Sequence, residues 1–331
     1  MDIDFVVSWV DMDDPSWQAS FAEWSSREGG SRNGLSKARF RDNGLLRYWF
    51  RGIERMCPWV RRIHFVTCGQ KPSWLDVSNP RLNLVSHADY IPERFLPTFN
   101  SSVLELYLHR IPGLAGHFVY FNDDVFATAP VPQNRFFSEE GLPRDIAAFR
   151  FNGGTGLWNR CLRNNMEILN RRFDKKQVQR EFPGKWFTPE YDGKDALTKL
   201  LRPCGKFPTF KVPHSAQPYL KETYVQVWDY AEAELLKASE HRFRSAEDYT
   251  QELMRGWQLC SGAFEPCNTY RDARMFPLLL KAGEAAEAVR EQRYRLVCLN
   301  DNARIKNYDA VMEELSRSFE SILPGKSSFE L

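Results

Sequence analysis

The stretch that decides the fold is His117-Phe118-Val119-Tyr120-Phe121, which leads at once into Asn122-Asp123-Asp124. Five residues rich in aromatic and β-branched side chains predict a buried β-strand. The three polar residues that follow end this strand with a cluster of carboxylate and amide oxygens. Such an ending is typical of an α/β sheet whose ligand site lies at the carboxyl ends of its strands.

Two other apolar runs end in the same way. Residues 5–10 lead into Asp11-Met12-Asp13-Asp14, and residues 295–299 lead into Asn300-Asp301-Asn302. If the three strands are parallel neighbours, their acidic ends converge on one crevice. Clustered carboxylates repel one another unless a cation lies among them, and ligand sets made only of oxygen favour Mg²⁺, Mn²⁺ or Ca²⁺.

The acidic ends therefore predict a hard cation together with the phosphates of a nucleotide or sugar diphosphate. Asp11-Met12-Asp13 also fits the DxD pattern associated with nucleotide-sugar transferases. The alternative is that Asp and Asn at strand ends are ordinary turn residues.

The rest of the chain alternates between strand and helix patterns. Strands are expected at residues 63–67 and 82–85, and helices at residues 42–53, capped by Asp42, and 102–110. This alternation predicts an α/β fold with a mostly parallel, Rossmann-like central sheet flanked by helices. The second half is expected to be more helical, with one helix beginning near Gln217-Pro218, a last strand at residues 294–299, and a final helix from Tyr308.

The composition excludes several classes of protein. The 331 residues carry 45 Lys and Arg against 43 Asp and Glu, a net charge of +2 that is too balanced for a protein that coats nucleic acid. No run approaches the roughly 18 apolar residues of a membrane-spanning helix. Seven cysteines without a CxxC pair indicate neither a disulfide framework nor a zinc ribbon. Because the chain also begins without a leader pattern, we expect a cytoplasmic protein.

Common catalytic signatures are missing. GxxxxGK[ST], GxGxxG, HExxH and GxSxG do not occur, which disfavours P-loop kinases, Rossmann dehydrogenases, metalloproteases and esterases. Residues 29–34 predict a mobile loop over the site. Five basic residues between 171 and 180 are interpreted as a solvated helix face, with contact to an anionic acceptor or a membrane surface as the alternative.

Two single residues are further candidates. His214 follows Pro213 on a short connection, where it could serve as a general base or a phosphate partner, or simply be a structural histidine. Arg244, in Arg244-Ser245-Ala246-Glu247-Asp248, could hold phosphate oxygens or form a surface ion pair.

Four blocks of the chain resemble the Stealth family of hexose-1-phosphate transferases. The first two correspond to residues 2–14 and 39–131, and the third is matched through Pro213-His214 and residues 244–248. The fourth is Val297-Cys298-Leu299-Asn300-Asp301-Asn302. All four occur in family order, and the family includes bacterial capsule enzymes and the catalytic subunit of the lysosomal-enzyme GlcNAc-1-phosphotransferase.

The resemblance implies one catalytic domain over residues 1–331 with a nucleotide-sugar-transferase-like fold. Residues 1–131 would form its nucleotide-sugar-binding part, residues 132–205 a variable part for the acceptor, and residues 206–331 a helical part that completes the site. The implied reaction moves hexose-1-phosphate from a nucleotide sugar, typically UDP-GlcNAc, to a hydroxyl of a glycan acceptor and releases UMP. Such transfer would serve capsule or exopolysaccharide synthesis, with peripheral contact to the inner face of the bacterial membrane.

The resemblance also assigns roles to residues. It implies catalysis by His214, Asp123 and Arg244, with Asp123 and His214 as rival bases. Mg²⁺ or Mn²⁺ would be held by Asp124, Asp301, Asn300 and Asn302. The donor would be bound by Trp9, Asp11, Arg39, Asp42, Asn43, Arg47 and Asn122.

Two rival functions remain open at this point. A conventional glycosyltransferase of the same α/β class would break the anomeric C–O bond and release UDP. A noncatalytic carbohydrate- or nucleotide-binding module would use the acidic strand ends only to hold a cation.

Overall fold

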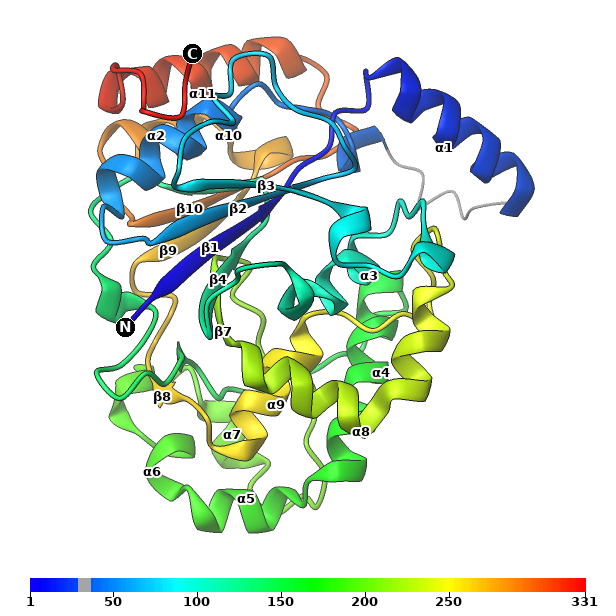
Figure 1. The fold of residues 1–331 in the computed structure, drawn as a ribbon. Helices are drawn as coiled ribbons and strands as arrows, with labels where there is room; N and C mark the ends of the chain where they lie inside the picture. The colour runs from blue at the N-terminus through cyan, green and yellow to red at the C-terminus, as the bar shows by residue number, and fades with distance from the viewer. Residues whose placement is uncertain (29–36) are drawn as a thin grey trace.

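Four parallel strands and one antiparallel strand form the central sheet of the computed structural model, which describes residues 1–28 and 37–331 (Figure 1). The strand order is β3-β2-β1-β4-β7. The bounds are β1 (Ile3–Ser8), β2 (Arg62–Thr67), β3 (Leu82–Ser86), β4 (His117–Phe121) and β7 (Gln217–Leu220). The predicted α/β fold with a mostly parallel sheet is confirmed. The loop expected at residues 29–34 lies outside the described residues.

A second sheet, β5-β10-β9, continues directly from the end of β4. β5 (Val125–Ala127) begins after Asp124 and pairs antiparallel with β10 (Leu296–Asn300), which pairs parallel with β9 (Ala273–Pro277). The expectation that the three acid-ended strands are neighbours in one parallel sheet is therefore wrong for β10. Its end still meets the end of β4, because the backbone N–H of Leu299 donates to the carbonyl of Asp124 at 2.8 Å.

Helices cover both faces of the central sheet. Alternate side chains of β1 point to opposite faces: Phe5 and Val7 pack with α2, α10 and α11, whereas Val6 packs with α3, α4, α8 and α9. The first group is α2 (Leu46–Met56), α10 (Leu278–Arg290) and α11 (Tyr308–Ile322), and the second is α3 (Ser101–Leu106), α4 (Leu157–Arg172), α8 (Lys221–Ser239) and α9 (Glu252–Ser261).

The other elements lie outside these two layers. They are α1 (Pro15–Glu28), α5 (Lys175–Glu181), α6 (Pro183–Trp186), α7 (Ala196–Leu200) and the short parallel pair β6 (Arg144–Asp145) and β8 (Glu265–Pro266). The second half of the chain is the more helical one, as the sequence predicts. In the described ranges, none of the helices combines the length and the apolar character that a membrane crossing requires.

Three local predictions are wrong. Lys175, in the basic run predicted as a solvated helix face, is fully buried, since its Nζ donates to three backbone carbonyls between residues 201 and 204. Residues 217–220 form strand β7 rather than the start of a helix, because they pair with the open edge of β4, where Pro218 is tolerated. Asp42 does not cap α2: Leu45 precedes that helix, and Oδ1 of Asp42 accepts the backbone N–H of Gly44 instead.

Close packing of α2 on β5 provides a test of the fold. A Cβ atom at Gly52 would lie 2.7 Å from the carbonyl oxygen of Ala127, whereas a Cβ atom at Gly283, in α10, would meet nothing within 4 Å. We therefore expect Gly52→Ala to lower the free energy of unfolding by about 1–3 kcal/mol through overpacking. The matched control Gly283→Ala should raise it by about 0.5–1 kcal/mol, since alanine is the better helix former. Urea denaturation of both variants measures this, and equal stabilities would contradict the packing described.

Candidate active site

The polar ends of β1 and β4 leave the central sheet side by side. The two strands are parallel neighbours with Val7 opposite Phe121, so that Trp9 and the Asn122-Asp123-Asp124 turn follow at the same edge. Nε1 of Trp9 donates to Oδ1 of Asp42 at 3.4 Å. This contact brings the chain that precedes α2 to the same edge.

Negative charge is concentrated around Asp123. Burial and the carboxylates of Asp124, Asp42 and Asp301 raise the pKa of Asp123 to about 7. Burial also raises the pKa of Asp42, and the charge of Asp11 adds to this effect. Carboxylates crowded in this way either bind a cation or keep a proton near neutral pH.

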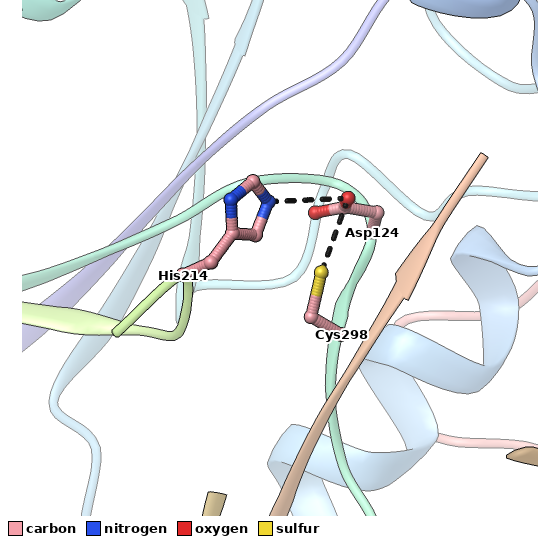
Figure 2. Close-up of side chains that lie close together, drawn as sticks. All are labelled: Asp124, His214 and Cys298. Carbon is pink, nitrogen blue, oxygen red and sulfur yellow. Dashed lines mark hydrogen bonds and ion pairs between the residues drawn. The ribbon is translucent and has the colours of Figure 1, made fainter. Parts of the chain in front are cut away.

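Asp124, His214 and Cys298 converge from three segments of the chain (Figure 2). Nε2 of His214 lies 3.6 Å from Oδ2 of Asp124, and the Cys298 thiol donates to the same oxygen at 3.3 Å. Burial opposes the charged form of Asp124, but the contacts with His214, Cys298 and Asn300 hold its pKa below the usual value. Burial likewise opposes the imidazolium, yet Asp124 raises the pKa of His214. The carboxylate therefore stabilises a proton on the imidazole.

The backbone holds His214 in an uncommon conformation. Its φ of 41° lies in the left-handed region that residues other than glycine rarely adopt. The flanking loop is fixed by a buried ion pair, since Arg255 donates to the carbonyl of Lys211 at 2.7 Å and Gln217 donates to Asp145 at 2.8 Å. Arg255 and Asp145 are themselves joined by two hydrogen bonds of 2.6 and 2.9 Å. A strained backbone that its surroundings fix is typical of functional sites.

Asp301, at the end of β10, is paired with an arginine. Nε and Nη2 of Arg41 donate to its two carboxylate oxygens at 2.7 and 2.6 Å. The same guanidinium lies over the ring of Tyr308, 3.4 Å from the centroid. The side-chain oxygen of Asn302 accepts a backbone N–H at 2.9 Å. Asp301 and Asn302, two of the predicted metal ligands, are thus engaged with neighbouring groups, as Oδ2 of Asp124 is.

Near the start of α3, Arg244 exerts its charge on a second arginine, Arg39. Nη2 of Arg244 donates to Oγ of Ser101 at 2.6 Å. Partial desolvation and the positive charge of Arg244 lower the pKa of Arg39 to about 10. Burial raises the pKa of Glu105 to about 7, although the charge of Arg244 opposes this. Guanidinium groups that act on each other in this way are suited to phosphate oxygens, which they bind with paired hydrogen bonds.

The other predicted donor-binding residues make local contacts. Asp11 and Asn43 each close a turn by accepting a backbone N–H at 2.9 Å. The guanidinium of Arg47 lies 5.5 Å from the ring centroid of Trp74. Asn122 is half-buried, and its carbonyl accepts the N–H of the residue that begins β5. Their roles toward a donor stay predictions.

Asp124 keeps one oxygen for a further ligand. In the described part of the chain, its buried Oδ1 has no hydrogen-bond partner. The ligand atoms of Asp124, His214 and Cys298 lie within 4.8 Å of one another, so the cluster could hold a metal ion. Burial and the charge of Asp124 raise the pKa of the Cys298 thiol well above its usual range, so that the thiol stays protonated while no metal ion is bound. Asp124 and the crowded carboxylate of Asp123 are the groups that fit a hard divalent cation.

Sequence reasoning missed three residues of this site. Cys298 lies two positions before Asn300, so the period of a strand places both on one face. Glu105 is an acid in an apolar helical stretch, which is a signal of a buried ionisable group. Arg41 gives no signal by itself, because its partner Asp301 is 260 residues away.

Three kinds of group thus lie around the ends of β1 and β4, since Phe40 and Phe243, the sequence neighbours of Arg39 and Arg244, pack with Val10 and Met12. Carboxylates suit a cation, arginines suit phosphate, and an imidazole beside a carboxylate can accept a proton. Positioning, charge neutralisation and proton acceptance are the requirements of phosphoryl transfer.

Comparison with known proteins agrees with this chemistry. Residues 39–145 match the family model of Stealth protein CR2, conserved region 2. Receptor polysaccharide phosphotransferase WefC of Streptococcus oralis and capsular polysaccharide phosphotransferase WcwK of Streptococcus pneumoniae are each 36% identical over 99% of both chains. Exopolysaccharide phosphotransferase cps2G of Lactiplantibacillus plantarum is 35% identical over 99% of this chain and 96% of that protein. The chain is therefore a phosphotransferase enzyme that belongs to the Stealth family, as the resemblance predicts.

Proposed function

We propose that this enzyme transfers hexose-1-phosphate from a nucleotide diphosphosugar, UDP-GlcNAc or a similar donor, to a hydroxyl of a glycan acceptor and releases UMP. The transfer would take place in the cytoplasm during capsule or exopolysaccharide synthesis, the role that the names of its relatives carry. The observation that best supports the proposal is the meeting of His214 with Asp124 at an acidic strand end.

The proposed reaction is a displacement at phosphorus. The acceptor oxygen forms a bond with the phosphorus nearest the sugar, and the bond from that phosphorus to the bridging oxygen breaks. The bridging oxygen leaves with UMP, and the anomeric C–O bond stays intact. Arg39 and Arg244 would hold the phosphate oxygens, whose charge is redistributed as the bond breaks.

His214 is proposed to accept the proton of the acceptor hydroxyl. Its Nε2 faces Asp124, and Nδ1 points away from that carboxylate (Figure 2). A carboxylate on one side of an imidazole orients the ring and stabilises the imidazolium that forms. Asp123 is the rival base, because its pKa of about 7 also allows it to take up a proton near neutrality.

The donor would lie between the first strand end and α2. Trp9 and Asp11 would contact the nucleotide, and Asp42, Asn43, Arg47 and Asn122 would line the pocket beside Arg39. Asp124 would hold Mg²⁺ or Mn²⁺, with Asn300, Asp301 and Asn302 in support, and Asp123 would join these ligands where His214 is the base. When bound, the cation supplies positive charge to the diphosphate of the donor.

Product analysis tests the reaction. With UDP-GlcNAc, Mg²⁺ and a capsule-type oligosaccharide, we expect UMP and a phosphodiester-linked product, because attack at phosphorus leaves the anomeric bond intact. Mass spectrometry and nucleotide chromatography detect both. Release of UDP without UMP would contradict the proposal and identify a conventional glycosyltransferase, and absence of turnover with a panel of nucleotide sugars would favour a binding module.

Substitution of His214 tests the base. His214→Ala should lower turnover by roughly 10²-fold or more, the usual scale for a lost general base, with donor binding largely retained. His117→Ala is the matched control, since His117 begins β4 at the opposite end of the strand from Asp123. Single-turnover rates and donor affinity are measured for both variants. Turnover by His214→Ala equal to that of the control would remove His214 from the mechanism and leave Asp123 as the candidate base.

Metal removal tests the cation. Chelation by EDTA should abolish turnover, and added Mg²⁺ or Mn²⁺ should restore it, because the carboxylates around Asp123 otherwise repel the donor diphosphate. Turnover that persists after exhaustive chelation, with no metal detected by elemental analysis, would show that the arginines suffice to hold the donor.

A further inference from the structure

A groove of about 420 Å³ lies between the start of α10 and the loop that leads into α11. Its lining is largely aliphatic and includes Leu279, Leu280 and Ile305. Leu280 is 80% exposed, more than any other large apolar side chain in the described part of the chain, and Leu279 is 40% exposed. Adjacent exposed leucines at the mouth of a groove indicate a surface that binds something apolar.

The local backbone explains why these leucines are exposed. α10 is interrupted at Lys281, where φ is −136° and ψ is 27°, so the first turn of the helix does not follow the axis of the rest. Leu278 packs into the core, whereas Leu279 and Leu280 project outward. The hydrophobic cost of this exposure is recovered only when the two side chains leave water.

Positive charge lines the same groove. Arg304 and Lys306 belong to its lining and are exposed. Lys281 adds little net charge, because it is paired with Glu284 at 2.9 Å. Leucines beside basic side chains are suited to a bilayer with anionic headgroups, where the apolar groups enter the interface and the cations remain among the phosphates. A second copy of this chain is less suitable, because a two-fold contact would bring these cations close to their own counterparts.

We propose that the leucine groove, formed by Leu279, Leu280, Arg304 and Lys306, docks the enzyme on an anionic lipid bilayer. Pro277, two residues before Leu279, lies opposite Asn300 in the β9–β10 ladder, so docking brings the active-site edge close to the lipid headgroups. Resting on the function proposed above, this position indicates a glycan acceptor that is presented at the bilayer surface.

Vesicle co-sedimentation tests the groove. The enzyme should bind vesicles of phosphatidylcholine with phosphatidylglycerol, bind phosphatidylcholine alone much more weakly, and dissociate as salt is raised. Arg304→Gln with Lys306→Gln should lower the partition coefficient by about 30-fold, because each lost contact between a basic side chain and the anionic surface lowers it by roughly fivefold. Leu279→Ser with Leu280→Ser should lower it by about tenfold or more, through lost apolar burial.

The matched control is Leu200→Ser with Lys206→Gln. Leu200 is 70% exposed and Lys206 is exposed, and α7 lies at the end of the molecule opposite α10 (Figure 1). This variant should bind vesicles like the parent enzyme. Equal binding by the leucine variant and the parent would overturn the proposal, as would self-association that depends on the leucines without any binding to vesicles.

Turnover with soluble donor and acceptor separates this inference from the proposed function. The leucine variant should release UMP at the parent rate, because its substitutions lie outside the candidate active site. A parent enzyme that binds anionic vesicles but releases UDP would contradict the proposed reaction and leave the docking surface intact. A parent enzyme that releases UMP but does not bind anionic vesicles would overturn the proposed docking surface and leave the proposed reaction intact.

Discussion

The candidate site depends on the antiparallel pairing of β5 with β10. The chain leaves the central sheet after Phe121, turns through residues 122–124 and enters a second sheet at Val125, which lies opposite Cys298. The backbone hydrogen bond from Leu299 to the carbonyl of Asp124, together with the side-chain bond from Cys298, therefore fixes the position of Asp124 relative to β10. Because Gly52 lets α2 approach β5 to contact distance, the same junction is also held from its other face. The acidic centre is thus positioned by backbone geometry, which costs little reorganisation when a ligand binds.

The charges at this junction are balanced only in part. Arg41 pairs with Asp301, and His214 lies beside Asp124. Among the described residues no ion pair joins Asp123 or Asp42 to a cation, although the charge of Arg47 acts on Asp42, and burial raises the pKa of each carboxyl group. A fully paired cluster would leave no affinity for a metal ion, and a fully unpaired one would destabilise the fold. Partial neutralisation keeps the folded chain stable and concentrates the remaining negative charge at the position where a divalent cation would bind.

The sequence predicts the central sheet well, because β1 and β4 are near-continuous apolar runs and their polar ends stand out. It predicts β10 as a strand but not its sheet. That sheet depends on β5, which has three residues and is too short to show a period. The sequence does not predict β7 either, because Gln217-Pro218 becomes a strand only by pairing with the open edge of β4. Among the site residues, the carboxylates at strand ends can be predicted from the sequence pattern. The pairing of Arg41 with Asp301 can be recognised only in the folded structure, because the two residues are 260 positions apart.

One short loop carries opposite charges at its two ends. Asp301 begins it at the acidic centre, and Arg304 and Lys306 follow within five residues at the leucine groove. Oδ1 of Asn302 accepts the N–H of Arg304 at 2.9 Å, which turns the backbone between the two regions. Because Arg41 rather than Arg304 pairs with Asp301, the cations of the loop remain available at the surface. The loop therefore keeps its two basic side chains separate from the carboxylate at its start.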